Sequence, residues 1–329
     1  MAALLAKIGI ISIGDMGVGI AKLLVANGFS VATNAKGRSD DTIERAKSAQ
    51  VELLDSDEAL TQQCSVILSV VPPRDALATA QRIADALSGP LRRSEDTTPL
   101  YFADLNAVSP STVKRIASLF DRRSRSLSVR FVDGSIIGGP PAPKPKPDSS
   151  SDGVEWALPR IPTSGPHKLS EIPDFGPKLA ATLNTRHISP DIGAASGLKM
   201  CFASFSKGFT ALAIQSFTTA HRLGVLSDLQ GELQALMPQR YELAEKGVVG
   251  MPPKAYRWVA EMEEIAHTLS EEGGFEPDSF IGAAKVYRTV ADDTVLGQEK
   301  IGKRKRGTTV EDVAAAVAEG LQTKRKKND

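Results

Sequence analysis

Small residues at a fixed spacing give the clearest chemical signal near the start of the chain. The pattern Ser-x-Gly-x-x-Gly (12–17) follows a β-branched run at 7–13 and precedes helical spacing at 18–26. A strand, a glycine-rich turn and a helix bring backbone N–H groups and the positive end of the helix dipole to the phosphates of a dinucleotide. A tight structural turn is the alternative interpretation. The expected cofactor contacts are Ser12, Gly14, Asp15, Met16 and Gly17, with serine in place of the usual first glycine.

The residues after the second expected strand indicate which dinucleotide is bound. Enzymes that use NAD usually carry an acid at this point, where it binds the ribose hydroxyls. Here no acid follows the strand at 30–33 until Asp40. Guanidinium and hydroxyl groups instead suit the extra phosphate of NADP. The sequence therefore predicts NADP(H) as the preferred cofactor, with NAD(H) as the alternative. The expected phosphate ligands are Asn34, Arg38 and Ser39, with Lys36 as a further candidate unless it and Arg38 only face solvent.

Lys199 is the candidate for proton transfer. Oxidation of an alcohol by hydride transfer needs a base for the hydroxyl proton, and the reverse reaction needs an acid. A lysine can fill this role when burial or a neighbouring positive charge lowers its pKa. Lys199 is the one charged residue in the run 194–202, which is otherwise small and mostly apolar. The residues alone leave two interpretations open, a catalytic lysine or a lysine that extends to solvent.

The elements that must position these groups follow from the hydrophobic pattern. Short apolar runs at 7–13, 30–33, 65–71, 100–104 and 129–133 alternate with amphipathic stretches, and a further strand is expected at 160–163. This alternation predicts an α/β fold, in which a Rossmann-type doubly wound parallel sheet occupies residues 1–192. A proline-, lysine- and serine-rich insertion at about 140–158 is expected to be solvated and partly polyproline-like.

Helical periodicity replaces the strand pattern from residue 193 onward. The segments 198–223, 256–269 and 310–321 all carry it, which predicts an all-helical domain at 193–329. Two basic clusters, 303–306 and 324–327, lie near the end of the chain. We expect them to form a solvated basic tail, and a nuclear-localisation signal is the alternative.

Composition excludes several classes of protein. The net charge of +1 argues against a role in coating nucleic acid. Two cysteines cannot form a disulfide framework, which favours a reducing compartment. The N-terminus lacks the features of a signal peptide, and no run of about 18 apolar residues predicts a membrane span. The four histidines have no metal-ligand spacing, so no metal site is expected. The expected location is the cytoplasm.

With these elements in place, the sequence resembles the 3-hydroxyisobutyrate and 6-phosphogluconate dehydrogenase superfamily, and within it the phosphogluconate-dehydrogenase-like branch. The matching segments occur in family order and cover most of the chain apart from the insertion and the basic tail. They are the glycine turn at 8–20, Val-Val-Pro-Pro at 70–73, Asp-Leu-Asn-Ala at 104–107, the strand ending in Gly-Gly at 131–139, and Gly-Ala-Ala-Ser-Gly-Leu-Lys at 193–199.

The resemblance implies further roles. Val71 and Pro72 belong to the loop beside the adenosine and pyrophosphate, and Asn106 to the segment that borders the nicotinamide. Gly138 and Gly139 would let the backbone approach the substrate, and Lys199 corresponds to the catalytic lysine. The resemblance also implies a homodimer formed through the helical domain.

Three departures from the superfamily pattern bear on the substrate. Phe202 and the residue after it stand where asparagine or histidine usually touches the substrate. Ile137 replaces a serine before Gly-Gly, and Glu261 corresponds to a lysine of the hydroxyacid members. These changes make the expected substrate site more apolar or less cationic. They favour a bulky or weakly charged hydroxyacid, ketone or imine over a sugar phosphate.

The sequence therefore supports an NADP(H)-dependent oxidoreductase with Lys199 as general acid and base. Two alternatives remain. One is a cofactor-binding sensor or interaction protein without turnover, motivated by the lost polar groups and the basic segments. The other is an imine-reductase-like enzyme, a group that typically lacks the lysine.

Overall fold

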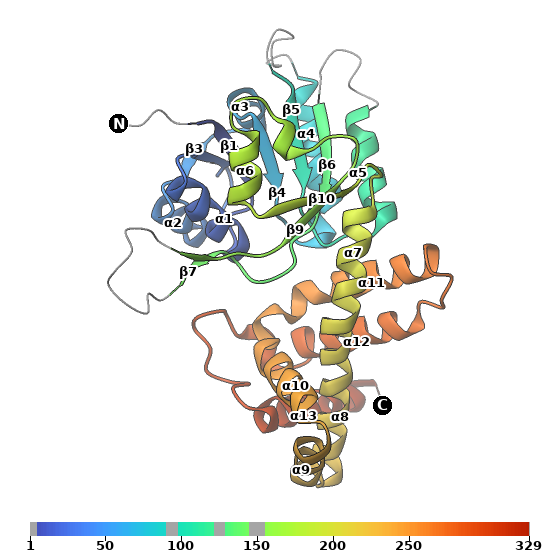
Figure 1. Ribbon diagram of the computed structural model, residues 1–329. Helices are drawn as coiled ribbons and strands as arrows, with labels where there is room; N and C mark the ends of the chain where they lie inside the picture. The colour runs from blue at the N-terminus through green and yellow to red at the C-terminus, as the bar shows by residue number, and fades with distance from the viewer. Residues whose placement is uncertain (1–4, 90–97, 122–128, 145–154, 329) are drawn as a thin grey trace. The chain divides into compact units, whose positions relative to one another are not determined.

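The alternating strands and helices of the first half of the chain form a mostly parallel eight-stranded sheet in the order β10-β9-β6-β5-β4-β1-β2-β3 (Figure 1). The computed structural model describes residues 5–89, 98–121, 129–144 and 155–328. The strands of this sheet are β1 (Lys7–Ile11), β2 (Ser30–Asn34), β3 (Glu52–Leu54), β4 (Val66–Ser69), β5 (Leu100–Asp104), β6 (Val129–Gly134), β9 (Ile161–Ser164) and β10 (Thr185–Ser189). The order β3-β2-β1-β4-β5-β6 is that of a dinucleotide-binding fold, so the predicted Rossmann-type sheet is confirmed.

Helices cover both faces of the sheet, as a doubly wound fold requires. They are α1 (Asp15–Ala26), α2 (Asp40–Ser48), α3 (Asp57–Gln63), α4 (Pro73–Leu87), α5 (Pro110–Asp121) and α6 (Gly176–Thr182), with a short 3₁₀ turn at Leu169–Glu171. The apolar faces of α1, α2 and α6 pack on one side of the sheet. Those of α3, α4 and α5 pack on the other side. The central strands β1, β4 and β5 are buried on both faces, which explains their nearly continuous apolar sequences.

The second half of the chain is helical. α7 (Ala194–Ala203) continues through a π-helical turn (Ser204–Gly208) into α8 (Phe209–Leu223). The remaining helices are α9 (Leu226–Leu236), α10 (Pro238–Gly250), α11 (Ala255–Glu271), α12 (Asp278–Asp292) and α13 (Val310–Asn328), with 3₁₀ turns at Pro252–Lys254 and Val295–Gln298. The chain divides into two compact units, Met1–Lys199 and Met200–Asp329. The division falls within α7, a few residues beyond the predicted boundary.

Two polar segments have more regular structure than their composition predicts. The ends of the proline-rich insertion pair as a two-stranded antiparallel ribbon of β7 (Ala142–Pro143) and β8 (Trp156–Ala157). Residues 145–154, which hold most of the expected polyproline-like stretch, lie outside the described part of the chain. The basic segments belong to the folded helical unit. Residues 303–306 form a loop in which Arg304 donates hydrogen bonds to backbone carbonyls, and Lys324 of α13 pairs with Asp293 at 2.7 Å.

No helix in the described part of the chain is both long and apolar enough to cross a membrane.

Candidate functional site

The turn between β1 and α1 has the geometry of a phosphate-binding loop. Gly14 is the N-cap of α1, and Val18 donates its backbone N–H to the Gly14 carbonyl at 2.8 Å. A Cβ added at Gly14 would meet only the Ser12 hydroxyl, 4.0 Å away, so the space over this backbone is open on the protein side. A Cβ added at Gly17 would lie 2.0 Å from the Ser12 carbonyl oxygen. Gly17 is therefore needed for packing, and Gly14 leaves room for a ligand.

Ser12 occupies the position of the missing first glycine and adopts the backbone that glycine favours. Its φ of 79° lies in the left-handed region, where a side chain crowds the backbone. We expect Ser12→Gly to raise the free energy of unfolding by about 1 kcal/mol, because such strain costs about 1–3 kcal/mol and glycine returns part of it as chain entropy.

Urea unfolding of the two proteins measures this effect. Ser39→Gly is the matched control, because Ser39 has a φ of −66° and therefore no such strain to relieve. The strain interpretation is wrong if Ser12→Gly is less stable than the unchanged protein.

A hollow opens beside this turn, at the carboxyl end of β2. We call it the β2 hollow. It joins the turn to the strand end where the sequence predicts phosphate ligands. Its walls are Ser12, Ile13, Thr33, Asn34, Ala35, Arg38, Thr42, Ile43, Ala46 and Leu53. Arg45 ties the two sides together, because its guanidinium donates to the Ile13 carbonyl and to the Thr42 hydroxyl, each at 3.0 Å. Sequence reasoning missed Arg45, since nothing in the pattern of α2 distinguishes it.

The three predicted phosphate ligands differ in how they are held. Arg38 and Ser39 are exposed, and the tight turn before α2 carries them, with the Arg38 N–H donating to the Ala35 carbonyl at 3.1 Å. Asn34 is instead held on both sides of its amide. Its Nδ2 donates to the Asp57 carboxylate at 2.7 Å, and its Oδ1 accepts from the Lys36 N–H at 3.0 Å. Asn34 therefore shapes the loop that carries the exposed residues.

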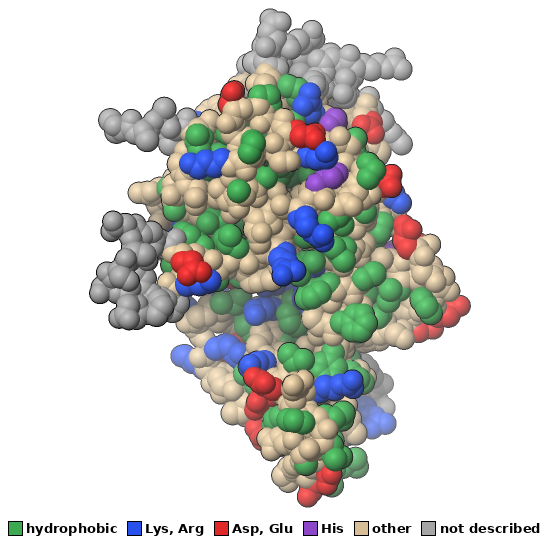
Figure 2. Space-filling view, viewed as in Figure 1, with side chains coloured by type: hydrophobic (Ala, Val, Ile, Leu, Met, Phe, Trp, Pro, Cys, Tyr) green, Lys and Arg blue, Asp and Glu red, His purple; other side chains and the backbone are tan. Residues whose placement is uncertain are grey.

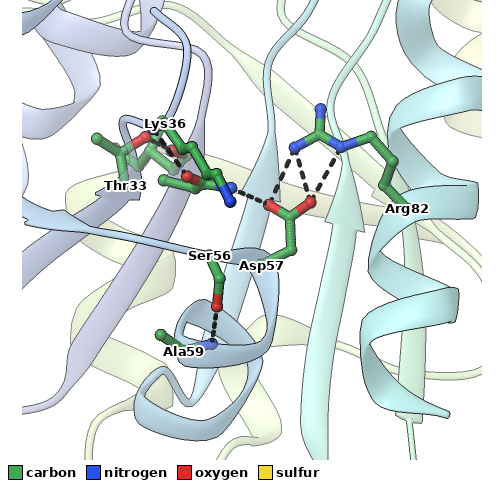
Figure 3. A network of polar contacts seen from close by, with 8 residues as sticks. Thr33, Lys36, Ser56, Asp57, Ala59 and Arg82 are labelled. Atoms are coloured by element: carbon green, nitrogen blue, oxygen red, sulfur yellow. Dashed lines mark hydrogen bonds and ion pairs between the residues drawn. The ribbon is translucent and has the colours of Figure 1, made fainter. Parts of the chain in front are cut away.

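Asp57 is itself clamped by Arg82, which sequence reasoning also missed (Figure 3). Arg82 of α4 reaches both carboxylate oxygens, with distances of 3.0, 2.9 and 2.7 Å. Ser56 caps α3 and places Asp57 in its first turn. The result is a chain of polar contacts from α4 through α3 to the end of β2.

Asn106 joins the carboxyl ends of β4 and β5. Its Oδ1 accepts the Val71 N–H at 2.7 Å, and its Nδ2 donates to the Ser69 hydroxyl at 3.0 Å and the Asp104 carboxylate at 2.8 Å. Both amide hydrogens are thus used inside the protein. This network fixes the loop of Val71 and Pro72, and Pro72 is the N-cap of α4. The fold thus places Asn106, Val71 and Pro72 at the same edge of the sheet. Contact of these residues with a cofactor stays a prediction.

The predicted substrate backbone follows β6. Ile137 exchanges two backbone hydrogen bonds with Arg160, at 2.8 and 2.9 Å. Gly138 has a φ of 127°, and a Cβ there would press on Pro159 at 3.3 Å. Gly139 has open space where a Cβ would be. Gly138 is therefore required by the chain itself, and Gly139 is the glycine that leaves room for a ligand.

Lys199 lies on a helix whose first turn is held by a buried carboxylate. Asp133 at the end of β6 is fully buried and accepts hydrogen bonds from the Gly193 N–H at 2.8 Å and the Ser196 hydroxyl at 2.7 Å. Ser164 donates to the same carboxylate at 2.7 Å and accepts the Ala195 N–H at 3.0 Å. A carboxylate near a helix N-terminus complements the helix dipole. Lys199 itself is only 9% exposed.

The other two predicted substrate residues lie in the second unit. Phe202, three positions after Lys199, is 49% exposed. Glu261 of α11 is buried and forms an ion pair with Lys207 of the π-helical turn, whose Nζ lies 5.0 Å from the centre of the Trp258 ring. Burial, and then the charge of Glu261, raise the pKa of the neighbouring Tyr287 phenol. The charge of Glu261 is thus balanced within its own unit, and its contact with a substrate stays a prediction.

Among the described residues, no group of three or more histidine, cysteine, aspartate or glutamate side chains could hold a metal ion.

Two family models match parts of the chain. Residues 7–91 match the family described as NADP oxidoreductase, coenzyme F420-dependent. These residues contain the glycine turn and the β2 hollow. Residues 220–290 match a domain of unknown function, DUF1932. The first match supports an NAD(P)-dependent oxidoreductase.

One curated relative and one solved structure match most of the chain at 25–27% identity. A curated relative from Methanothermus fervidus, an uncharacterized 28.5 kDa protein in the 7S RNA 5′ region, is 25% identical over 269 residues, which are 80% of this chain and 92% of that protein. The conserved protein MTH1747, described as structurally similar to 3-hydroxyacid dehydrogenases, is 27% identical with a TM-score of 0.57, covering 86% of this chain and 97% of its own.

A third match shows the fold alone. The 3-hydroxyisobutyrate dehydrogenase of Mycobacterium tuberculosis is 14% identical with a TM-score of 0.61, over 95% of this chain and 98% of its own. Sheet order, helical second half, family match and relatives all agree with the resemblance found in the sequence. The chain is therefore similar in fold to 3-hydroxyacid dehydrogenases, and its residues 7–91 match a family of NADP oxidoreductases.

Proposed function

We propose that the protein is an NADP(H)-dependent oxidoreductase of the 3-hydroxyacid dehydrogenase type, which transfers hydride between nicotinamide and a hydroxyacid or carbonyl substrate. One observation carries the proposal. Ser12 and Ile13, which lead directly into the open backbone at Gly14, line the same hollow as Arg38 at the acid-free end of β2. This combination suits a pyrophosphate and a ribose phosphate that are joined in one molecule.

The residues present fit such a cofactor, which supplies or accepts the hydride when bound. Backbone N–H groups at the start of α1 would hold the pyrophosphate, because Gly14 adds no side chain above them. Arg38 and Ser39 would hold the extra phosphate, with Lys36 as a further cation. Asp15 and Met16 extend this turn, and Asn106 keeps Val71 and Pro72 in position beside it.

We assign the proton transfer to Lys199. In the oxidative direction its amine takes the hydroxyl proton of the substrate, and in the reductive direction its ammonium returns it. Two observations support this role. The side chain is mostly buried, and the anchored first turn of α7 gives it a defined position. Asp133, Ser164 and Ser196 act as positioning residues for that helix.

The substrate class follows from the residues proposed to contact it. Ile137 and Phe202 offer no charge, and Gly138 and Gly139 offer backbone groups. A sugar phosphate would need several cations or hydroxyls that these residues lack. A hydroxyacid or carbonyl compound with an apolar substituent fits better.

Titration of the purified protein with NADPH and NADH, followed by nicotinamide fluorescence, tests the cofactor assignment. We expect saturable binding of both, with NADPH the tighter. The absorbance of NADPH is then followed with 2- and 3-hydroxyacids, ketones and cyclic imines. Coenzyme F420 is included because the matched family uses it.

The possible results separate the candidates. Turnover of a hydroxyacid or its ketone supports the proposal, whereas turnover of cyclic imines alone favours an imine-reductase-like enzyme. Tight binding without turnover in the panel favours a sensor. Failure to bind either dinucleotide contradicts the proposal. Cytoplasmic location and the lack of a nucleic-acid partner stay predictions.

We further propose that the protein forms a homodimer through its helical unit. Phe205, Leu212 and Leu223 are 84%, 58% and 71% exposed, and their spacing of 7 and 11 residues aligns them along one face of the π-helical turn and α8. Figure 2 shows apolar side chains on the surface of this unit. Exposed apolar stripes of this kind mark protein interfaces, and the superfamily resemblance implies a second copy as the occupant.

Sedimentation velocity measures the oligomeric state. We expect a dimer for the unchanged chain and a 35.0 kDa monomer for Phe205→Asp/Leu212→Asp, because charge on an apolar interface opposes its burial. Leu243→Asp is the control, since Leu243 is a similarly exposed leucine (63%) on a different helix, α10. A monomeric unchanged chain, or a dimer that survives both charges, contradicts the proposal.

A further inference from the structure

The tertiary structure brings an acid to the end of β2, although the sequence has none there. In enzymes that use NAD, a carboxylate at this strand end binds the ribose hydroxyls and repels a phosphate at the same point. Asp57 lies 23 residues after Asn34, yet its Oδ1 is 2.7 Å from the Asn34 Nδ2. Asn34 is part of the wall of the β2 hollow. The Asp57 carboxylate therefore lies behind Asn34, which separates it from the space proposed for the ribose.

Arg82 balances the charge of this carboxylate. The Asp57 side chain is 13% exposed, and the Arg82 guanidinium contacts both of its oxygens in a bidentate arrangement (Figure 3). Bidentate pairs of this kind are stronger than hydrogen bonds between neutral side chains. The Asp57–Arg82 pair has no net charge. The net charge at the end of β2 is therefore positive and comes from Lys36 and Arg38.

Asn34 links the Asp57 carboxylate to the loop that follows β2. Its Nδ2 is engaged by Asp57 and its Oδ1 by the Lys36 N–H. Loss of Arg82 would leave the carboxylate without its bidentate partner while Asn34 still held it at the hollow. The end of β2 would then resemble that of an enzyme that uses NAD.

We propose that Arg82 is a specificity-determining residue, which permits NADP(H) binding by neutralising Asp57 behind the β2 hollow. This inference rests on the proposed function, because it concerns the selectivity of the same cofactor site. It assigns Arg82 an electrostatic role at a distance from the ligand, with Asp57 as the group through which it acts.

Dissociation constants of NADPH and NADH for Arg82→Met measure the effect, since methionine keeps much of the apolar stem. We expect NADPH to bind about tenfold more weakly, because an unpaired charge several ångströms from a phosphate dianion costs about this factor. NADH should change by less than about twofold. Asp57→Asn combined with Arg82→Met removes the uncompensated charge and should restore NADPH binding.

Two further variants separate charge from structure. Arg82→Lys keeps the charge without the bidentate geometry and should stay near the unchanged protein, which keeps the test valid even if Arg82→Met folds poorly. Arg74→Met controls for the loss of one positive charge on α4, because its contact with Asp75 is a loose 3.7 Å. It should leave both constants unchanged.

The outcomes distinguish this inference from the proposed function. Equal weakening of NADPH and NADH in Arg82→Met, or failure of the double variant to restore NADPH, overturns the inference and leaves the cofactor site intact. Failure of the unchanged protein to bind either dinucleotide overturns both.

Discussion

Lys199→Ala is expected to lower kcat by at least about 100-fold while leaving the dissociation constant of NADPH within about twofold. General acid–base catalysis by a positioned side chain contributes about 10²–10⁴-fold, and the alanine variant has no group to carry the proton. The lysine lies on α7, beyond the turn held by Asp133, and outside the β2 hollow where we propose cofactor binding. Steady-state kinetics with the substrate found in the panel, together with an NADPH titration, measure both quantities.

Lys114→Met is the matched control for this variant. Lys114 of α5 is a neighbour of the same region, since its Cε is 3.2 Å from where a Cβ on Gly193 would lie. Its loss should change kcat by less than about threefold, because the expected catalytic effect depends on proton transfer rather than on the presence of a nearby cation. Retention of most turnover in Lys199→Ala excludes the proton-transfer role. Parallel loss of turnover and NADPH binding would instead assign Lys199 to the structure of the cofactor site.

Alanine at the two turn glycines is expected to separate ligand binding from folding. Gly14→Ala should weaken NADPH binding at least about tenfold and change the stability by less than about 0.5 kcal/mol. Its methyl group meets no protein atom closer than the Ser12 hydroxyl at 4.0 Å, and it enters the space proposed for the phosphates. Gly17→Ala should cost about 3 kcal/mol of stability, since its methyl group would lie 2.0 Å from the Ser12 carbonyl oxygen.

Calorimetry and NADPH titration of both variants measure this contrast. Gly231→Ala in α9 is the control, because an added Cβ there meets nothing within 4 Å and lies far along the chain from the turn. It should be neutral or slightly stabilising, as alanine favours helix. Unchanged NADPH binding by Gly14→Ala would mean that the turn is only structural.

Most of the correct predictions concern features that consecutive residues form. The glycine turn and the acid-free end of β2 could be recognised because strand, turn and helix are consecutive and their backbone geometry is local. The buried strands were visible because a sheet covered on both faces requires continuous apolar runs. The apolar run around Lys199 left open whether its side chain is buried or extends to solvent, and the structure places it at 9% exposure.

Short or weakly patterned elements were missed. β3 has three residues and β10 is only partly buried, so neither carries a distinctive run. The basic segments near the C-terminus looked like a tail, because composition does not reveal that Lys324 meets Asp293 across 31 residues.

The long-range polar contacts around the β2 hollow and at the start of α7 depend on the tertiary structure alone. Asp57 meets Asn34 across 23 residues and Arg82 across 25, and Asp133 meets Gly193 across 60. Carboxylates and guanidinium groups at such separations have no spacing rule, because only the packing of α3, α4 and α7 around the sheet brings them together. The sequence by itself determined where a dinucleotide and a catalytic lysine would be sought. The tertiary structure decided how the charges behind the β2 hollow are balanced and how the lysine's helix is held.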